Sequence, residues 1–146
     1  MPYGSFDEGF TTMEEYKKAG INTVVMLTSD EENFERSGLN LKKLYAENGI
    51  EVIYLPIVDF DVPKEDSGLE DALQLAVAQA AEGKNLAVHC YAGRGRTGMF
   101  AALLARRILG LDGQKAIEWV RQYFPAIETD AQAKRVVEDE GRDCSC

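Results

Sequence analysis

Residues 89–98 read HCYAGRGRTG and decide the fold. They follow a short apolar run at 85–89 (NLAVH), typical of a buried strand, and lead into TGMFAALLARRILG, which starts at Thr97 and is apolar enough for a buried helix. The prediction is a strand, a tight loop and a helix. Glycines let successive backbone N–H groups turn toward one point, and the helix N-terminus adds about half a positive charge there. Such a loop can cradle a phosphate dianion.

Three side chains of this segment can do chemistry. Cys90 leaves the strand in a field that favours the thiolate, so we expect it to be a nucleophile. Arg96 offers a planar fork of donors for two phosphoryl oxygens, and Thr97 can donate a hydrogen bond to the sulfur. The alternative for Cys90 is a small buried hydrophobic residue. The loop is not a nucleotide-binding P-loop, because it lacks the required lysine. The predicted phosphate-binding residues are Tyr91, Ala92, Gly93, Arg94, Gly95 and Arg96.

The rest of the chain alternates strand and helix patterns, which indicates an α/β layered domain. Buried strands are predicted at 21–27, 50–55 and 85–89. A helix begins at Thr11 or Thr12, and others are predicted from about 29, at 41–47, 69–83, from 97, at 112–123 and at 130–140. The proline-bounded segment 56–68 is predicted to be a loop long enough to move.

Charge and hydropathy exclude several classes of protein. The chain has 146 residues with 16 Lys and Arg against 25 Asp and Glu, a net charge of -9. This balance argues against nucleic acid and anionic membranes as partners. There is no apolar run of about 18 residues, and MPYGSFDEGF lacks the basic and apolar regions of a signal peptide. We expect a cytoplasmic protein without integral membrane contact.

Cysteine and histidine usage gives no sign of a disulfide framework or a metal site. Cys90, Cys144 and Cys146 are too few for a framework and fit a reducing compartment. The last two cysteines lie in 141–146, a predicted flexible tail, and we expect no catalytic role for them. His89 is the only histidine and has no nearby partner ligands, so no metal is expected.

The segment HCYAGRGRTG resembles the His-Cys-x5-Arg-Thr signature of cysteine-based protein tyrosine phosphatases, and its GxGRTG ending is similar to the dual-specificity branch. GINTVVMLTSDEE, PIVDFDVP and IETDAQ resemble further landmarks of the family in the same order, so the resemblance covers nearly all of the chain. It implies one phosphatase domain over 1–146, with a central, mostly parallel sheet flanked by helices on both faces. It also implies a monomer that hydrolyses phosphomonoesters through a phosphocysteine, without a cofactor.

The resemblance implies a general acid in the D-x-x-x-P pattern that starts at Asp59. Asp61 is the alternative, and both aspartates could instead be solvated loop residues. Val58 stands where relatives often have proline, and this difference is expected to loosen the loop. The resemblance also implies that His89 fixes the loop backbone, whereas the residues alone allow an ordinary buried histidine.

A polar segment precedes the last predicted helix. On the residues alone, Glu128, Thr129 and Gln132 fit a helix start with a cap. In the family, a glutamine in such a segment orients the water that hydrolyses the phosphocysteine. The resemblance therefore implies this role for Gln132 and places Glu128 and Thr129 at the floor or rim of the pocket.

The substrate class stays open between several phosphorylated compounds. The chain is too short for the extra strands of the larger, tyrosine-only phosphatases, which predicts a shallower pocket than theirs. The first expected substrate is a phosphorylated protein, with activity on phosphotyrosine and some activity on phosphoserine or phosphothreonine. Arg94 adds a second cation to the loop, as in phosphoinositide and inositol-phosphate phosphatases, or is a solvated surface arginine. The alternatives of another class are a phosphate-reading binding module and an arsenate reductase, or a redox switch with Cys144 and Cys146.

Overall fold

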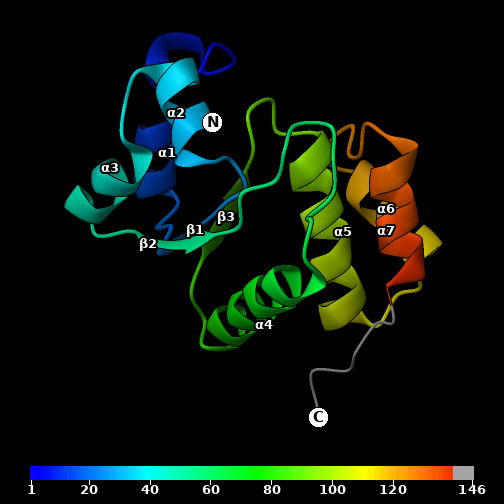
Figure 1. Cartoon of the computed structure of the whole chain (residues 1–146). Coiled ribbons are helices and arrows are strands. Elements are labelled where there is room, and N and C mark those ends of the chain that lie inside the picture. The colour runs from blue at the N-terminus through cyan, green and yellow to red at the C-terminus, as the bar shows by residue number, and fades with distance from the viewer. Residues whose placement is uncertain (140–146) are drawn as a thin grey trace.

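Three short strands form a parallel sheet in the order β2-β1-β3 (Figure 1). The strands are β1 (Thr23–Met26), β2 (Glu51–Tyr54) and β3 (Leu86–His89). Each is shorter than the segment predicted from sequence. Because all three are parallel, their carboxyl ends share one edge, and Met26 lies opposite Tyr54 and His89 there. The segment that follows His89 therefore starts at the edge where α/β folds place their sites.

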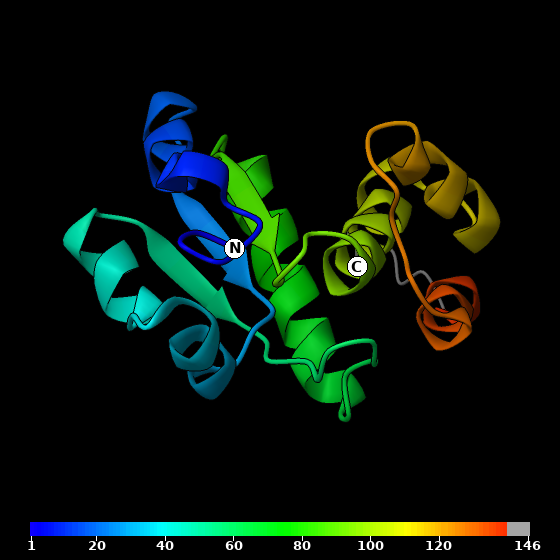
Figure 2. The same cartoon turned by 90° about the horizontal axis from the view of Figure 1, so that it is seen from above.

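Helices cover both faces of the sheet, as Figure 2 shows from above. One face carries the 3-10 turn η1 (Glu8–Phe10), α1 (Thr12–Lys18), α2 (Asp30–Ser37) and α3 (Leu41–Glu47). The other carries α4 (Asp66–Ala81) and α5 (Gly95–Leu109), with α6 (Gly113–Arg121) and α7 (Asp130–Glu138) packed on α5. The predicted α/β fold with a central parallel sheet is confirmed.

Successive residues of β1 pack into two different hydrophobic cores, one on each face of the sheet. Val25 faces the core formed with α4 and α5, whereas Val24 and Met26 face the core that holds Leu41 and Tyr45 of α3. All five side chains are buried. Successive side chains of a strand point to opposite faces, so a continuous apolar run is what a sheet covered on both faces requires. Burial of each such side chain contributes about 1.5–3 kcal/mol.

Side-chain caps set the start of four helices. Ser29 accepts a hydrogen bond from the Glu32 N–H at the start of α2, and Asp112 accepts one from the Lys115 N–H at the start of α6. Asn40 and Thr129 cap α3 and α7 in the same way. The long helix α4 begins at Asp66, earlier than predicted, and the acidic Asp66 in its first turn complements the helix dipole. The loop after β2 therefore ends at Glu65.

The computed structural model describes residues 1–139. The predicted tail at 141–146, with Cys144 and Cys146, lies outside these described residues. Within 1–139, no helix combines the length and apolar character needed to cross a membrane.

Candidate active site

Cys90 stands directly after β3, at the carboxyl edge of the sheet. Its side chain is buried, and the hydroxyl of Thr97 in the first turn of α5 donates a hydrogen bond to its sulfur at 3.1 Å. The strand, the loop and the helix start thus bring a thiol and a hydroxyl seven residues apart into contact. A hydroxyl donor stabilises negative charge on sulfur more than it stabilises the neutral thiol.

His89 joins the loop backbone to α3. Nδ1 lies 3.1 Å from the carbonyl oxygen of Cys90, and Nε2 lies 2.8 Å from the hydroxyl of Tyr45. Burial, helped by the positive charges of the N-terminal amine and, to a smaller extent, Arg96, lowers the pKa of His89 to about 3, while burial raises the pKa of Tyr45. The ring is therefore neutral, with Nδ1–H donating to the Cys90 carbonyl and Nε2 accepting from Tyr45. This arrangement fixes the backbone at Cys90.

Arg96 is almost fully buried, with 1% of its side chain exposed. Both terminal nitrogens donate to the carboxylate of Glu32, at 2.7 and 2.8 Å, and one also donates to the Ile57 carbonyl at 2.8 Å. Burial lowers the pKa of Arg96, but the hydrogen bonds and charge of Glu32, with Asp59 and Cys90, raise it overall. Nε is buried and has no hydrogen-bond partner. A buried cationic donor without a partner is costly, and an anion would satisfy it.

Two residues of this cluster were not predicted from the sequence. Glu32 belongs to a landmark segment, but nothing in its spacing indicates that it binds Arg96, which lies 64 residues away. Arg36, one helical turn further on, lies 3.8 Å from Asp59 and stacks at 3.9 Å on the ring of Tyr91. The first two turns of α2 therefore contact two loops. One is residues 55–65, between β2 and α4, which we call the acid loop; the other is residues 90–96, the Cys90 loop.

The two candidate acids of the loop after β2 have different surroundings. The carboxylate of Asp59 lies 3.3 Å from the guanidinium of Arg96. The carboxylate of Asp61 accepts a hydrogen bond from its neighbour Val62 at 2.8 Å, and its backbone carbonyl accepts from Gln132 at 3.2 Å. The structure thus brings Asp59, and not the Asp61 carboxylate, to the arginine of the Cys90 loop.

Gln132 belongs to the first turn of α7, and its side chain is fully buried beside the Cys90 loop. Its side-chain oxygen accepts from the backbone N–H groups of Glu128 and Thr129, while the Thr129 hydroxyl accepts from the Gln132 N–H, which makes a capping box. The capping function inferred from the residues alone is therefore present. A Cβ on Gly95 would come within 3.1 Å of both polar atoms of the Gln132 carboxamide, so Gln132 also touches the loop.

A depression of about 290 Å³ opens over the Cys90 loop. Its lining residues are Phe6, Arg36, Asp59, Phe60, Tyr91, Ala92, Arg94 and Glu128. Tyr91 packs against Phe6 at 5.0 Å between ring centres, and Gly93 makes the turn of the loop with a φ of 81°. Predicted site residues from three separate segments therefore share one concave surface. Among residues 1–139, no group of three or more His, Cys, Asp or Glu is placed to hold a metal.

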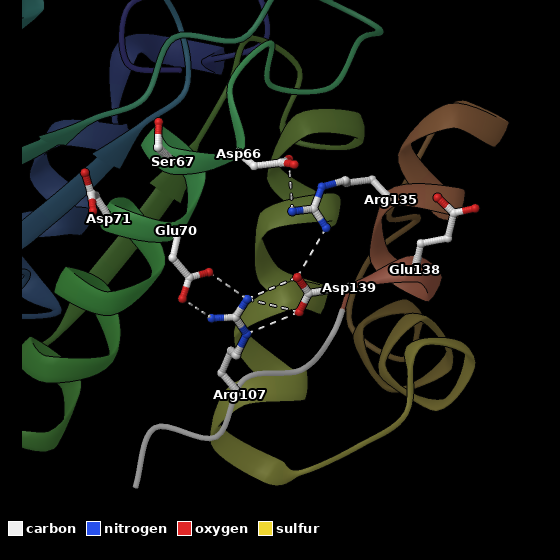
Figure 3. A pocket seen from close by; sticks show the side chains of 8 residues that line it. All are labelled: Asp66, Ser67, Glu70, Asp71, Arg107, Arg135, Glu138 and Asp139. Carbon is white, nitrogen blue, oxygen red and sulfur yellow. Dashed lines mark hydrogen bonds and ion pairs between the residues drawn. The ribbon is translucent and has the colours of Figure 1, made fainter. Parts of the chain in front are cut away.

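A second depression, of about 480 Å³, lies away from the Cys90 loop between α4, α5 and α7 (Figure 3). Arg107 binds the Glu70 carboxylate through two nitrogens, at 3.1 and 3.0 Å, and also binds Asp139. Arg135 lies 3.2 Å from Asp139 and 3.4 Å from Asp66. These arginines hold three helices together. The hollow is lined by charged side chains that bind one another.

Comparison with protein families gives one match over most of the chain. The profile of the family Tc-R-P, described as "Polymorphic toxin system, DSP-PTPase phosphatase", matches residues 4–108. Two uncharacterized proteins of Methanocaldococcus jannaschii are similar in sequence. One is 34% identical over 93 residues, which cover 61% of this chain and 59% of the relative. The other is 37% identical over 94 residues, 61% of this chain and 55% of the relative. The chain spans less than two thirds of each relative's length.

Solved phosphatase structures share the fold. Tk-PTP in its active form is 28% identical, with a TM-score of 0.74 over 86% of this chain and 84% of that one. Kinase associated phosphatase, with its catalytic cysteine changed to serine, is 24% identical and has a TM-score of 0.82 over 94% and 81%. PTPMT1 in complex with PI(5)P is 22% identical, with a TM-score of 0.75 over 88% and 81%.

Proposed function

This chain belongs to the DSP-PTPase phosphatase family of polymorphic toxin systems, within the cysteine-based protein tyrosine phosphatases, and we propose that it hydrolyses phosphomonoesters through a phosphocysteine on Cys90. One observation carries the proposal. The buried guanidinium of Arg96 has a donor without a partner, Nε, in the loop that begins at Cys90. A phosphoryl group bound in this loop would satisfy that donor.

In the first step, the sulfur of Cys90 attacks phosphorus, so that an S–P bond forms and the bond to the leaving oxygen breaks. Backbone N–H groups of the loop and Arg96 hold the phosphoryl oxygens. Asp59 protonates the leaving oxygen, which would otherwise depart as an unstable alkoxide or phenoxide. Its contact with Arg96 at 3.3 Å supports its choice over Asp61.

In the second step, water attacks the phosphocysteine. An O–P bond forms, the S–P bond breaks, and Asp59 accepts the proton from water. Gln132 would orient the water, and its contact distances to Gly95 put its carboxamide beside the loop. Thr97 stabilises the leaving thiolate through the hydrogen bond it donates to sulfur. The positive charge needed in both steps comes from Arg96 and the helix N-terminus, so the scheme uses no cofactor.

Phosphorylated tyrosine, with some phosphorylated serine or threonine, is the first proposed substrate. Phe6, Phe60 and Tyr91 line the depression and offer apolar surface to an aromatic leaving group. A phosphoinositide or inositol phosphate is the second candidate. Arg94 lines the same depression and makes no ion pair with any residue in the described part of the chain, so it is available for an additional phosphate. The fold neighbour PTPMT1 was solved with PI(5)P.

The test is phosphate release from an aryl phosphate in EDTA, with the wild type and Cys90→Ser, followed by phosphopeptides and a soluble phosphoinositide. We expect EDTA-resistant turnover that the variant lacks, and the ratio of peptide to inositide activity separates the two substrate candidates. Turnover retained by Cys90→Ser would contradict the mechanism. Tight phosphate binding without turnover would favour a binding module, and arsenate-dependent thiol consumption would favour an arsenate reductase.

A further inference from the structure

A carboxylate already occupies part of the Cys90 loop. Glu128 Oε1 accepts a hydrogen bond at 3.0 Å from the backbone N–H of Gly95, the residue directly before Arg96. The approach is close, because a Cβ on Gly95 would lie only 2.8 Å from the same oxygen. In the proposed mechanism, the N–H groups of this loop bind phosphoryl oxygens. Glu128 therefore uses a donor that the substrate also needs.

The segment that carries Glu128 is held in place by an unusual backbone. Ile127 has a φ of 70°, a conformation that a β-branched residue rarely adopts. Its N–H donates to the carbonyl of Arg94 in the loop at 3.0 Å. Gly98 permits this approach, since a Cβ there would lie 2.6 Å from the Ile127 nitrogen. Strain of this kind destabilises the chain and is retained mainly where function requires it.

The Glu128 side chain stands at the mouth of the site. It lines the depression together with Asp59 and Arg94. Asp59 is neutralised by Arg96 at 3.3 Å and Arg36 at 3.8 Å, whereas Glu128 makes no ion pair with any residue of 1–139. A phosphoryl dianion that enters the loop thus meets one negative charge without a cationic partner. A second anionic group next to the phosphoryl would meet the same charge.

We propose that Glu128 is a specificity-determining residue, which competes with the phosphoryl group for the Gly95 N–H and disfavours substrates with a second negative charge beside the phosphoryl. The inference rests on the proposed function, because it requires that phosphate binds in the Cys90 loop. Arg94 lines the same depression and would attract a second anionic group, so the proposal sets Glu128 against Arg94 and favours the phosphotyrosine candidate over the phosphoinositide one.

A purely structural function of Glu128 predicts something different. A carboxylate at the N-terminus of α5 would stabilise the helix through the helix dipole. Its loss would then lower the melting temperature and leave anion affinity unchanged or weaker. Competition instead predicts that anion affinity rises when the charge is removed, whatever happens to the stability.

The experiment measures binding to proteins that cannot turn over. Cys90→Ser, alone or combined with Glu128→Gln or Glu128→Ala, is titrated by calorimetry with inorganic phosphate, phenyl phosphate and 2-carboxyphenyl phosphate. The last two ligands differ by one carboxylate beside the phosphoryl. Removal of a like charge a few ångströms away should tighten phosphate and phenyl phosphate by roughly tenfold. The gain should be severalfold larger for 2-carboxyphenyl phosphate.

Glu31→Gln in the Cys90→Ser background is the matched control. Glu31 lines a neighbouring hollow and is not among the residues that line the depression over the Cys90 loop, so its loss makes the same change of net charge without touching the Gly95 N–H. Affinities that rise equally in this control, or that do not rise in either Glu128 variant, would overturn the inference and leave the proposed function intact. Absence of phosphate binding to Cys90→Ser itself would overturn the proposed function, and the inference with it.

Discussion

Helix α5 carries two buried arginines with the same kinds of partner and different hydrogen bonding. Arg96 binds both oxygens of Glu32 and lies near Asp59, and Arg107 binds both oxygens of Glu70 and also Asp139. Their side chains are 1% and 3% exposed. In Arg107, Nε donates to Asp139 at 3.2 Å, whereas Nε of Arg96 has no partner.

This difference separates an element of stability from an element of function. Every nitrogen of the Arg107 guanidinium donates to Glu70 or Asp139, so the charged residues around this hollow act as a clamp between helices. The buried, unsatisfied Nε of Arg96 keeps a cost that an anion bound in the Cys90 loop would remove. An unsatisfied Nε does not identify a site by itself, because Arg106, whose guanidinium donates to the carbonyls of Val136 and Val137, has one too. The size of a hollow alone therefore does not locate the site. The hydrogen bonds of the arginine beside it, and the loop it faces, are also needed.

Arg96→Lys should have the largest effect of any change to the two clusters. Lysine keeps the charge but cannot bind Glu32 and a phosphoryl group through a planar fork. We expect kcat to fall by about 10³-fold or more, since a cation of this kind contributes about 10³–10⁵-fold to phosphoryl transfer. Steady-state hydrolysis of an aryl phosphate measures it. A fall of less than tenfold would show that Arg96 does not hold the transferring group.

Arg107→Met tests the other half of the comparison. Removal of one partner from a buried ion-pair network leaves the carboxylates of Glu70 and Asp139 without their shared cation, which costs about 3–5 kcal/mol. Chemical denaturation should show this loss, while kcat at a temperature where the variant is folded should stay within about threefold. If Arg107→Met impaired turnover as strongly as Arg96→Lys, the division between the two clusters would be wrong.

Glu32→Gln should have a smaller effect on activity, because Glu32 positions Arg96 and does not itself touch the substrate. Glutamine keeps one acceptor oxygen and loses the two-pronged contact, so Arg96 can tilt away from the loop. A displacement of about 1 Å can cost about 10²-fold in rate. We expect kcat/KM to fall by roughly 10–100-fold, with partial recovery in Glu32→Asp. Equal loss in both variants would indicate a general folding defect.

His89→Gln should give the smallest effect, and it depends on pH. The unfolded state binds a proton near the ordinary histidine pKa of about 6.5, and the folded state only near 3, so wild-type stability falls as the pH drops through this window. This one group should remove about 2 kcal/mol between pH 7 and 5. Urea denaturation at pH 7 and at pH 5 should show that the free energy of unfolding falls by about 2 kcal/mol less in the variant than in the wild type. Equal slopes would mean that His89 titrates normally.

Local spacing explains why the centre of the site could be predicted from the sequence. The contact between Cys90 and Thr97 arises between the end of a strand and the first turn of the next helix, so its geometry is set within the eight residues 90–97. The contact between Arg96 and Glu32 spans 64 residues and depends on how α2 packs beside the acid loop, which no local pattern encodes. The hydrogen bond from Gly95 to Glu128 likewise depends on the left-handed conformation of Ile127, which the isoleucine itself disfavours.

Detection of the phosphoenzyme tests the central claim most directly. Wild type and Cys90→Ser are mixed with an aryl phosphate, quenched in denaturant within one turnover, digested and examined by mass spectrometry. We predict a phosphoryl group on the wild-type peptide that contains Cys90, and none on any peptide of the variant. Rapid turnover without phosphate on that peptide, or with phosphate on another residue, would contradict the account.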